Sequence, residues 1–162
     1  MLHILCMDLE GPLSPQDNAY DVMALSRDGE MLFEVISRYD DLLALESREG
    51  YEAGDTLVLM VPFLLTEGIK RGDFEEVSRR AGLVQGAVET VNGLRSRGWD
   101  VFIISTSYEY HAMNVAKRLS IPEDHVYCTK VPAGVFEQTL SNEERRLIRR
   151  TKEMILSKLF SP

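Results

Sequence analysis

The stretch Leu2-His3-Ile4-Leu5-Cys6-Met7-Asp8-Leu9-Glu10-Gly11 opens the chain and decides its fold. Its first part is a short, mostly apolar run, which then meets two acids and a glycine. A run that ends in this way is typical of a parallel strand that is buried on both faces. We therefore expect residues 2–7 to form the first strand of an open parallel α/β sheet.

Two further strands and their helices are expected after residue 86. The apolar spacing of residues 87–94 predicts a helix that stops at Gly98, and residues 101–104 follow as a buried strand. Ser105-Thr106-Ser107 then opens a helix through about residue 119, and residues 125–129 resemble a third strand. This alternation of strands and helices is the order of a Rossmann-like sheet.

The segment between the first two strands has a different pattern. Residues 15–82 are polar, have apolar residues at helical spacing and contain several turn signals. We expect helices here, one capped by Asp55 and another by Asp73 with Glu76. At the other end of the chain, Ser141 and Glu144 predict a capping box for a helix through Phe160. The domain boundaries that we expect are therefore 1–14 and 83–162 for the core and 15–82 for a helical insert.

The residues that follow the strands are the candidates for chemistry, because ligands of parallel sheets bind beyond the carboxyl ends of the strands. Asp8 and Glu10 alternate with Leu9 and should project to the same side. One carboxylate can attack phosphorus while the other acts as acid and base, and two acids that face a phosphate favour Mg²⁺. Asp, Glu and Gly are also ordinary turn residues, so the stretch alone is not diagnostic.

Ser105, Thr106 and Ser107 are the matching candidates after the second predicted strand. Their hydroxyls, together with free N–H groups at a helix N-terminus, would bind phosphate oxygens. In isolation such a triplet is more often a simple helix cap. The conjunction of both groups at two parallel strand ends is what favours a phosphate site.

Composition excludes several classes of function. The 162 residues are 44% hydrophobic, which suits a soluble domain, and the formal net charge of −8 argues against nucleic-acid binding. The longest apolar run, residues 57–65, is too short to span a membrane and contains Pro62. Without a signal-peptide pattern we expect the cytoplasm, where Cys6 and Cys128 would be buried thiols in strands.

At residues 2–13 and 101–105 the sequence resembles the haloacid-dehalogenase-like (HAD) superfamily. Its first motif is an apolar strand followed by Asp-x-Asp-Gly, and its second is an apolar strand that ends in Ser or Thr. The resemblance is nearest to the phosphoserine phosphatase and homoserine phosphotransferase branch, in which Asp-Leu-Glu-Gly can replace Asp-x-Asp-Gly. It covers about residues 2–130.

The resemblance implies a role for each of these residues. Asp8 would be the nucleophile and an Mg²⁺ ligand, and Glu10 would be the acid/base and a second metal ligand. Ser105 would bind the transferred phosphoryl group, and Asp17 lies where phosphoserine phosphatases hold a substrate amine, although it would equally serve as a helix cap. The insert would be a C1-type cap. The remaining residues expected near the phosphate are Gly11, Thr106 and Ser107.

The resemblance also raises an expectation about the end of the chain. Nothing after Thr129 resembles the fourth motif of the superfamily, an apolar strand with Gly-Asp that supplies acidic metal ligands, so we expect a chain cut before it. For the lysine of the third motif only Lys130, Lys152 and Lys158 are available. We also expect self-association, because such a chain would leave a sheet edge and an apolar helix face uncovered.

Three hypotheses follow from the sequence. The first is a Mg²⁺-dependent phosphatase that forms an aspartyl-phosphate on a small, phosphoserine-like metabolite. The second is a catalytically silent binding or regulatory module, or an inactive fragment, that keeps the framework. The third is an ordinary α/β domain with a chance acidic turn. Asp8, Glu10 and Ser105 favour the first.

Overall fold

The computed structural model describes residues 2–157 and divides the chain into two compact units. Unit 1 comprises residues 1–18 and 74–130, and unit 2 comprises residues 19–73 and 131–162. Within the described residues no helix is both long and apolar enough to cross a membrane.

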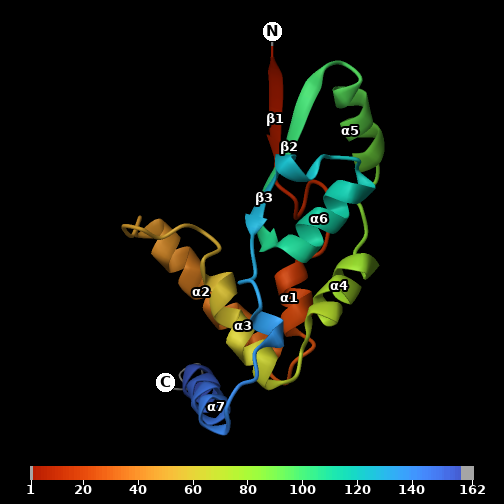
Figure 1. Ribbon diagram of the computed structural model, residues 1–162. Coiled ribbons are helices and arrows are strands. Elements are labelled where there is room, and N and C mark those ends of the chain that lie inside the picture. The colour runs from red at the N-terminus through yellow and green to blue at the C-terminus, as the bar shows by residue number, and fades with distance from the viewer. Residues whose placement is uncertain (1, 158–162) are drawn as a thin grey trace. The chain divides into compact units, whose positions relative to one another are not determined.

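Unit 1 contains a three-stranded parallel sheet, as predicted (Figure 1). Its strands are β1 (His3–Met7), β2 (Trp99–Tyr108) and β3 (Val126–Thr129), in the order β1-β2-β3. The register pairs Met7 with Ile103 and Ile103 with Val126. The carboxyl ends of the strands therefore point in one direction, and the residues after β1 lie beside the second half of β2.

One face of this sheet is covered by α5 (Ala87–Arg95) and α6 (Glu109–Arg118). Both helices connect consecutive neighbouring strands, and because parallel crossovers are right-handed, strands added in one direction place their helices on one face. The buried core that results combines residues from the strands, from both helices and from the turn after β1. Its members are Leu9, Leu13, Ala87, Val91, Val101, Ile103, Ala112, Val115, Ala116, Leu119, Ile121 and Val126.

The opposite face of the sheet is exposed, so the prediction of a first strand buried on both faces is wrong. Ile4 keeps 51% of its surface accessible, and Cys6 on the same face is exposed rather than buried as expected. Leu5 on the covered face is half-buried because β1 lies at the edge of the sheet. The apolar run does form a strand, but the exposure of that strand depends on the order of the strands in the sheet, which the run does not encode.

The second strand is longer than predicted. We expected Ser105 to open a helix, but β2 continues to Tyr108 and α6 begins at Glu109. The extension follows from pairing with β3, whose Thr129 lies opposite Tyr108 across an irregularity in the register. The three hydroxyl residues therefore belong to a strand and offer no N–H groups of a helix terminus.

Unit 2 is helical, and its described residues contain no strand. It holds most of α1 (Asn18–Met23) together with α2 (Gly29–Leu45), α3 (Thr56–Thr66) and α7 (Asn142–Ser157), and α4 (Arg71–Arg80) leads back to unit 1. The predicted helical character of the insert is confirmed. The helix α7, which we placed with the core, packs against α2 and α3 instead.

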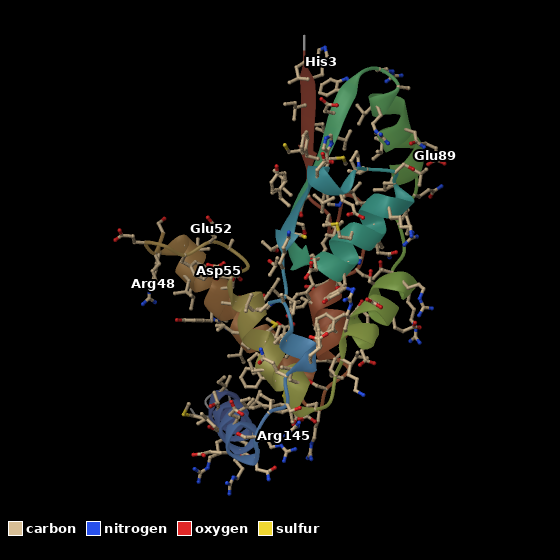
Figure 2. The ribbon with its side chains drawn as sticks, viewed as in Figure 1. His3, Arg48, Glu52, Asp55, Glu89 and Arg145 are labelled. Atoms are coloured by element: carbon tan, nitrogen blue, oxygen red, sulfur yellow. The ribbon has the colours of Figure 1, made fainter. Side chains whose placement is uncertain are left out.

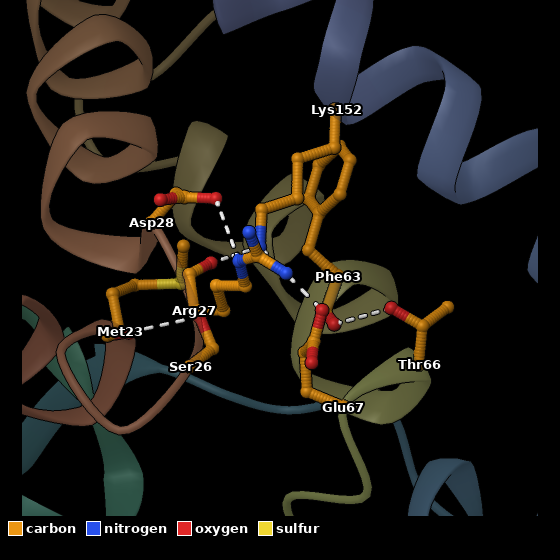
Figure 3. Close-up of polar contacts among 8 residues, drawn as sticks. All are labelled: Met23, Ser26, Arg27, Asp28, Phe63, Thr66, Glu67 and Lys152. Atoms are coloured by element: carbon orange, nitrogen blue, oxygen red, sulfur yellow. Dashed lines mark hydrogen bonds and ion pairs between the residues drawn. The ribbon is translucent and has the colours of Figure 1, made fainter.

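Lys152 explains why α7 lies with these helices (Figure 3). Its side chain is buried, its amine donates a hydrogen bond to the carbonyl oxygen of Arg27, and its Nζ lies 3.5 Å from a carboxylate oxygen of Glu67. A buried ammonium needs both a charge partner and hydrogen-bond acceptors, which the loop before α2 and the end of α3 provide. This long-range arrangement has no counterpart in the local sequence pattern.

The helix caps were partly predictable. Ser141 and Glu144 form the expected capping box, with Ser141 N–H donating to Glu144 over 2.8 Å and Glu144 N–H donating to the Ser141 hydroxyl over 3.2 Å. Asp55 lies at the N-cap position of α3, but its side chain makes no capping hydrogen bond to that helix, and its carboxylate accepts the Glu52 N–H over 3.1 Å instead (Figure 2). Asp73 does not cap a helix that follows it, because α4 already begins at Arg71. The predicted C-terminal positions Leu159 and Phe160 lie outside the described residues.

In unit 2 the carboxylate of Asp40, on α2, holds the loop that follows this helix. The Oδ1 atom of Asp40 accepts hydrogen bonds from the Tyr51 hydroxyl, from the Gly54 N–H over 3.0 Å and from the Thr56 hydroxyl over 2.7 Å. Burial alone would raise the pKa of Asp40, but these hydrogen bonds outweigh it and leave the pKa below its ordinary value. The loop is therefore held to α2 by an ionised carboxylate, one oxygen of which accepts three hydrogen bonds.

Candidate active site

The candidate site is built on a tight turn after β1. Leu9 and Leu13 are fully buried, and the N–H groups of Leu13 and Ser14 both donate to the Leu9 carbonyl, over 3.0 and 2.9 Å. Gly11 lies in the turn with a φ of +98°, a backbone conformation that residues with a Cβ atom rarely adopt. The two leucines anchor the turn in the core, so Asp8 before Leu9 and Glu10 after it are held at the end of β1.

Asp8 and Glu10 lie in contrasting surroundings. Asp8 is exposed, and its Oδ1 accepts the N–H of Leu9 over 2.7 Å. Glu10 is half-buried, and its Oε1 accepts the backbone N–H of Asn18 over 3.0 Å. One carboxylate is therefore open to incoming groups while the other is partly removed from water.

The pKa of Glu10 is raised above its ordinary value. Burial is the largest cause, and the negative charges of Asp17 and Asp8 add to it, whereas the Asn18 N–H and the nearby Ser107 hydroxyl lower the pKa. Among the described residues the Ser107 hydroxyl has no hydrogen-bond partner, although it lies close enough to Glu10 to lower the pKa of that carboxyl. A carboxyl group whose protonated form is favoured in this way suits a general acid.

The three hydroxyl residues of β2 have separate positions. Ser105 is half-buried, and its oxygen accepts the Ser107 N–H over 3.0 Å; Thr106 is exposed, and its carbonyl accepts the Thr129 hydroxyl over 2.8 Å. Ser107 is buried next to Glu10. The structure thus brings Asp8, Asp17 and Ser107 around Glu10, and the register places Ser105 just beyond the Met7–Ile103 pair. Its phosphate-binding role stays a prediction.

Asn18 is a site residue that the sequence analysis missed. It is fully buried, its N–H holds Glu10, and neither polar atom of its side chain has a hydrogen-bond partner among the described residues. Its position directly after Asp17, at the start of a helix, was the available signal. Gln16 was missed as well: its Oε1 accepts the Gly82 N–H over 3.0 Å and fixes the end of the turn.

His111 is the remaining buried polar side chain of this unit that lacks described hydrogen-bond partners on its ring nitrogens. Burial lowers its pKa to about 4, and the positive charge of Arg118 contributes. The ring is therefore neutral at physiological pH. It lies in the first turn of α6, four residues after Ser107, and both its nitrogens are available to a neutral polar group.

Asp8 and Glu10 fit a Mg²⁺ ion only if the protein supplies few of its ligands. The described residues contain no group of three or more His, Cys, Asp or Glu side chains placed to hold a metal. Mg²⁺ commonly uses one or two carboxylates and completes its shell with water and substrate phosphate oxygens. Asp8 uses one carboxylate oxygen for the Leu9 N–H, so its other oxygen fits such a role.

Of the late lysines considered for a phosphate clamp, Lys152 is engaged in unit 2 by Arg27 and Glu67. Lys158 lies outside the described residues. Lys130 belongs to unit 1, directly after β3, and its side chain is exposed. Among the described residues, Lys130 is therefore the remaining candidate for the lysine of the third motif.

Solved structures with the same arrangement include two kinds of hydrolase. A phosphoserine phosphatase in a phospho-aspartyl intermediate analogue is 21% identical, with a TM-score of 0.56 over 82% of this chain and 59% of that chain. A HAD family hydrolase from Salmonella enterica serovar Typhi is 14% identical, with a TM-score of 0.56 over 80% of this chain and 41% of that chain. The chain has the HAD-like fold. The fold predicted from the motifs of β1 and β2 is thereby confirmed.

A gene product of Archaeoglobus fulgidus is more similar in detail. It is 30% identical, with a TM-score of 0.81 over 100% of this chain and 55% of that chain. The chain thus spans about half the length of the solved structures that it matches. No family model matches the sequence, and no curated protein sequence is significantly similar to it.

Proposed function

We propose that this chain carries the nucleophile and the acid/base of a phosphoric-monoester hydrolase that works through an aspartyl-phosphate. The observation that supports the proposal is the contrast between exposed Asp8 and half-buried Glu10, whose pKa is raised. Two carboxyl groups kept in different environments at one strand end are typical of an acid/base assignment. One similar structure is itself a phospho-aspartyl intermediate analogue of a phosphoserine phosphatase.

The proposed reaction has two displacements. A carboxylate oxygen of Asp8 attacks the phosphorus, the bond from phosphorus to the ester oxygen breaks, and protonated Glu10 gives its proton to the leaving oxygen. Glu10, now ionised, takes a proton from a water molecule that attacks the phosphorus of the acyl phosphate. The bond to Asp8 breaks, phosphate leaves, and Glu10 is protonated again.

Mg²⁺, when bound, would offset the negative charge of the phosphate beside two acids. We propose that Asp8 and Glu10 would hold it, the latter through its backbone carbonyl. Gly11 leaves space at the turn: apart from its own atoms and its two chain neighbours, no described atom lies within 4 Å of the position that a Cβ there would occupy. Ser105, Thr106 and Ser107 would then orient the phosphate oxygens from β2.

The proposed substrate is a small phosphorylated metabolite of the phosphoserine type, in the cytoplasm. Asp17 is exposed and close enough to raise the pKa of Glu10, so a cationic group bound to Asp17 would lie next to the leaving oxygen. A substrate amine in that position would also relieve the repulsion between the acids. Phosphorylated hydroxy acids that lack the amine should then be poorer substrates.

The test is whether phosphate release depends on Asp8. The chain would be incubated with Mg²⁺ and an aryl phosphate, and the released phosphate would be assayed. We expect phosphate release in the parent, none in Asp8→Asn, and unchanged release in Asp100→Asn, an exposed acid of β2 outside the site. Release that persists in Asp8→Asn would contradict the mechanism.

Magnesium binding separates the proposal from the alternative of a silent module. Calorimetry with Mg²⁺ alone and with Mg²⁺ plus inorganic phosphate would report binding independently of turnover. Binding that is lost in Asp8→Asn, without phosphate release by the parent chain, would favour the regulatory module over the hydrolase. Binding together with release would support the hydrolase.

A further inference from the structure

The backbone N–H of Asn18 contacts the acid/base, but the proposed function gives this N–H no role. It donates a hydrogen bond to Oε1 of Glu10 over 3.0 Å. Asn18 is fully buried, and both residues belong to unit 1. Because the two residues are separated along the chain, the contact depends on the shape of the turn after β1.

Hydrogen bonds hold the segment between these two residues in one shape. The Gly11 N–H donates to the carbonyl oxygen of Ser14 over 2.7 Å, and the Ser14 hydroxyl donates to the side-chain oxygen of Gln16 over 3.2 Å. The same oxygen of Gln16 accepts the N–H of Gly82 over 3.0 Å. The segment is therefore tied to itself and to a distant part of unit 1, so the Asn18 N–H is held in place before any substrate binds.

The two oxygens of a protonated carboxyl group have different roles. One carries the proton and donates it, whereas the other acts as the acceptor. A donor on Oε1 therefore favours the form of Glu10 that carries its proton on Oε2. After the proton has left, Oε1 still accepts the same N–H, because both oxygens of a carboxylate are acceptors. The contact serves both forms, and the side chain of Glu10 need not turn between them.

The proposed reaction needs an acid/base that keeps one orientation. Asp8 attacks the phosphorus in the first displacement and leaves it in the second. Because the attacking and leaving oxygens lie roughly in line, the ester oxygen leaves from the position opposite Asp8, and the water enters at that same position. The oxygen of Glu10 that protonates the ester must therefore face the place from which the water attacks. An uncharged N–H can hold the carboxyl group there in both steps, whereas a lysine or arginine would favour its ionised form.

We propose that Asn18 is a positioning residue for the acid/base: its backbone N–H holds Oε1 of Glu10, so that Oε2 both protonates the ester oxygen and accepts a proton from water. This inference rests on the proposed function. Asn18 acts on the reacting atoms only through Glu10. Loss of its N–H should therefore weaken proton transfer to the leaving oxygen more than the attack by Asp8.

Two substitutions separate the N–H of Asn18 from its side chain. Asn18→Pro removes the N–H, and because Asn18 is the first residue of α1, a proline fits the helix at this position. Asn18→Ala keeps the N–H and removes the side-chain amide, which has no hydrogen-bond partner among the described residues. Asn142→Pro is the control for the proline, since Asn142 is likewise the first residue of a helix, α7, and is exposed in unit 2.

Two esters of similar shape measure the proton transfer. Phenolate is a stronger base than nitrophenolate, so phenyl phosphate needs protonation of its leaving oxygen more than nitrophenyl phosphate does. The ratio of the two kcat/KM values, measured with Mg²⁺, does not depend on how much of a variant is folded. In Asn18→Pro the value for phenyl phosphate should fall roughly threefold to tenfold more than that for nitrophenyl phosphate. Asn18→Ala and Asn142→Pro should keep the ratio of the parent.

The outcomes separate this positioning role from the proposed function. Equal losses for the two esters in Asn18→Pro would overturn the role, as would the same change of ratio in Asn18→Ala or in Asn142→Pro. In each of these cases, release that is still abolished by Asp8→Asn would leave the proposed function in place. If the parent chain released phosphate from neither ester, both the proposed function and the role of Asn18 would be overturned.

Discussion

Glu10 in unit 1 and Asp40 in unit 2 are both partly buried carboxylates, but they are held in opposite ways. Asp40 accepts three hydrogen bonds from Tyr51, Gly54 and Thr56, and its pKa lies below the ordinary value. Glu10 accepts one backbone N–H, stands near two other acids, and its pKa is raised. A satisfied carboxylate stabilises a loop, whereas an incompletely satisfied one is kept ready to exchange a proton.

The largest expected difference between the two carboxylates is in turnover. Glu10→Gln keeps the size and the acceptor for the Asn18 N–H but cannot donate a proton as an acid, so phosphate release should fall roughly 10²–10⁴-fold. Asp40→Asn should leave the turnover of the folded protein unchanged. Steady-state release of phosphate from an aryl phosphate, at a temperature where both variants remain folded, measures both. Equal losses in the two variants would remove the distinction.

The second difference is in stability, in the opposite direction. Asp40→Ala leaves three donors without their acceptor and should lower the free energy of unfolding by about 1–3 kcal/mol, toward the smaller value because the site is partly exposed. Asp41→Ala is the matched control, since Asp41 is the next residue of α2 and is exposed. Urea unfolding at pH 7 gives both values. An equal effect of the two substitutions would show that the Asp40 cluster does not stabilise unit 2.

The contrast between these carboxylates also shows what the sequence could predict. The run of residues 2–7 predicted β1, and the acids after it were expected correctly at the strand end, because alternation and strand termination are local properties. The capping box of Ser141 and Glu144 was likewise local and is confirmed. The hydrogen bond from Tyr51 to Asp40 was not predictable in this way, since the two residues lie eleven positions apart.

What could not be predicted depends on distant segments. The exposed face of β1 follows from the order of the strands and the hand of their connections, which the apolar run does not specify. The place of Ser107 beside Glu10 requires a strand extended by pairing with β3. The position of α7 in unit 2 requires Lys152 to reach Arg27. In each case the local sequence pattern predicted the helix or strand, whereas contacts with distant segments determined its surroundings.

The pH dependence of stability should separate the two carboxylates further. Because the pKa of Glu10 is raised in the folded state, its protonated form contributes stability that is present below the ordinary pKa of 4.5 and is lost as pH rises through the folded value. At pH 7 the melting temperature of Glu10→Gln should therefore be a few degrees higher than that of the parent. Near pH 4 the two melting temperatures should be the same. Melting curves from pH 4 to 8 test this, and a variant less stable than the parent at pH 7 would contradict the raised pKa.

The smallest expected effect is that of Tyr51→Phe. It removes one of the three donors to Asp40 and should lower the free energy of unfolding by about 0.5–1.5 kcal/mol at pH 7. The pKa of Asp40 is lowered in the folded state, so its contribution is present above the ordinary value of 3.8 and is lost as pH falls through the folded value. Without the phenol the pKa is lowered less, so the variant loses less stability in acid. The difference in urea midpoint between parent and variant should therefore be smaller at pH 3 than at pH 7. A constant difference would mean that Tyr51 acts through packing alone and that Asp40, unlike Glu10, is insensitive to its donors.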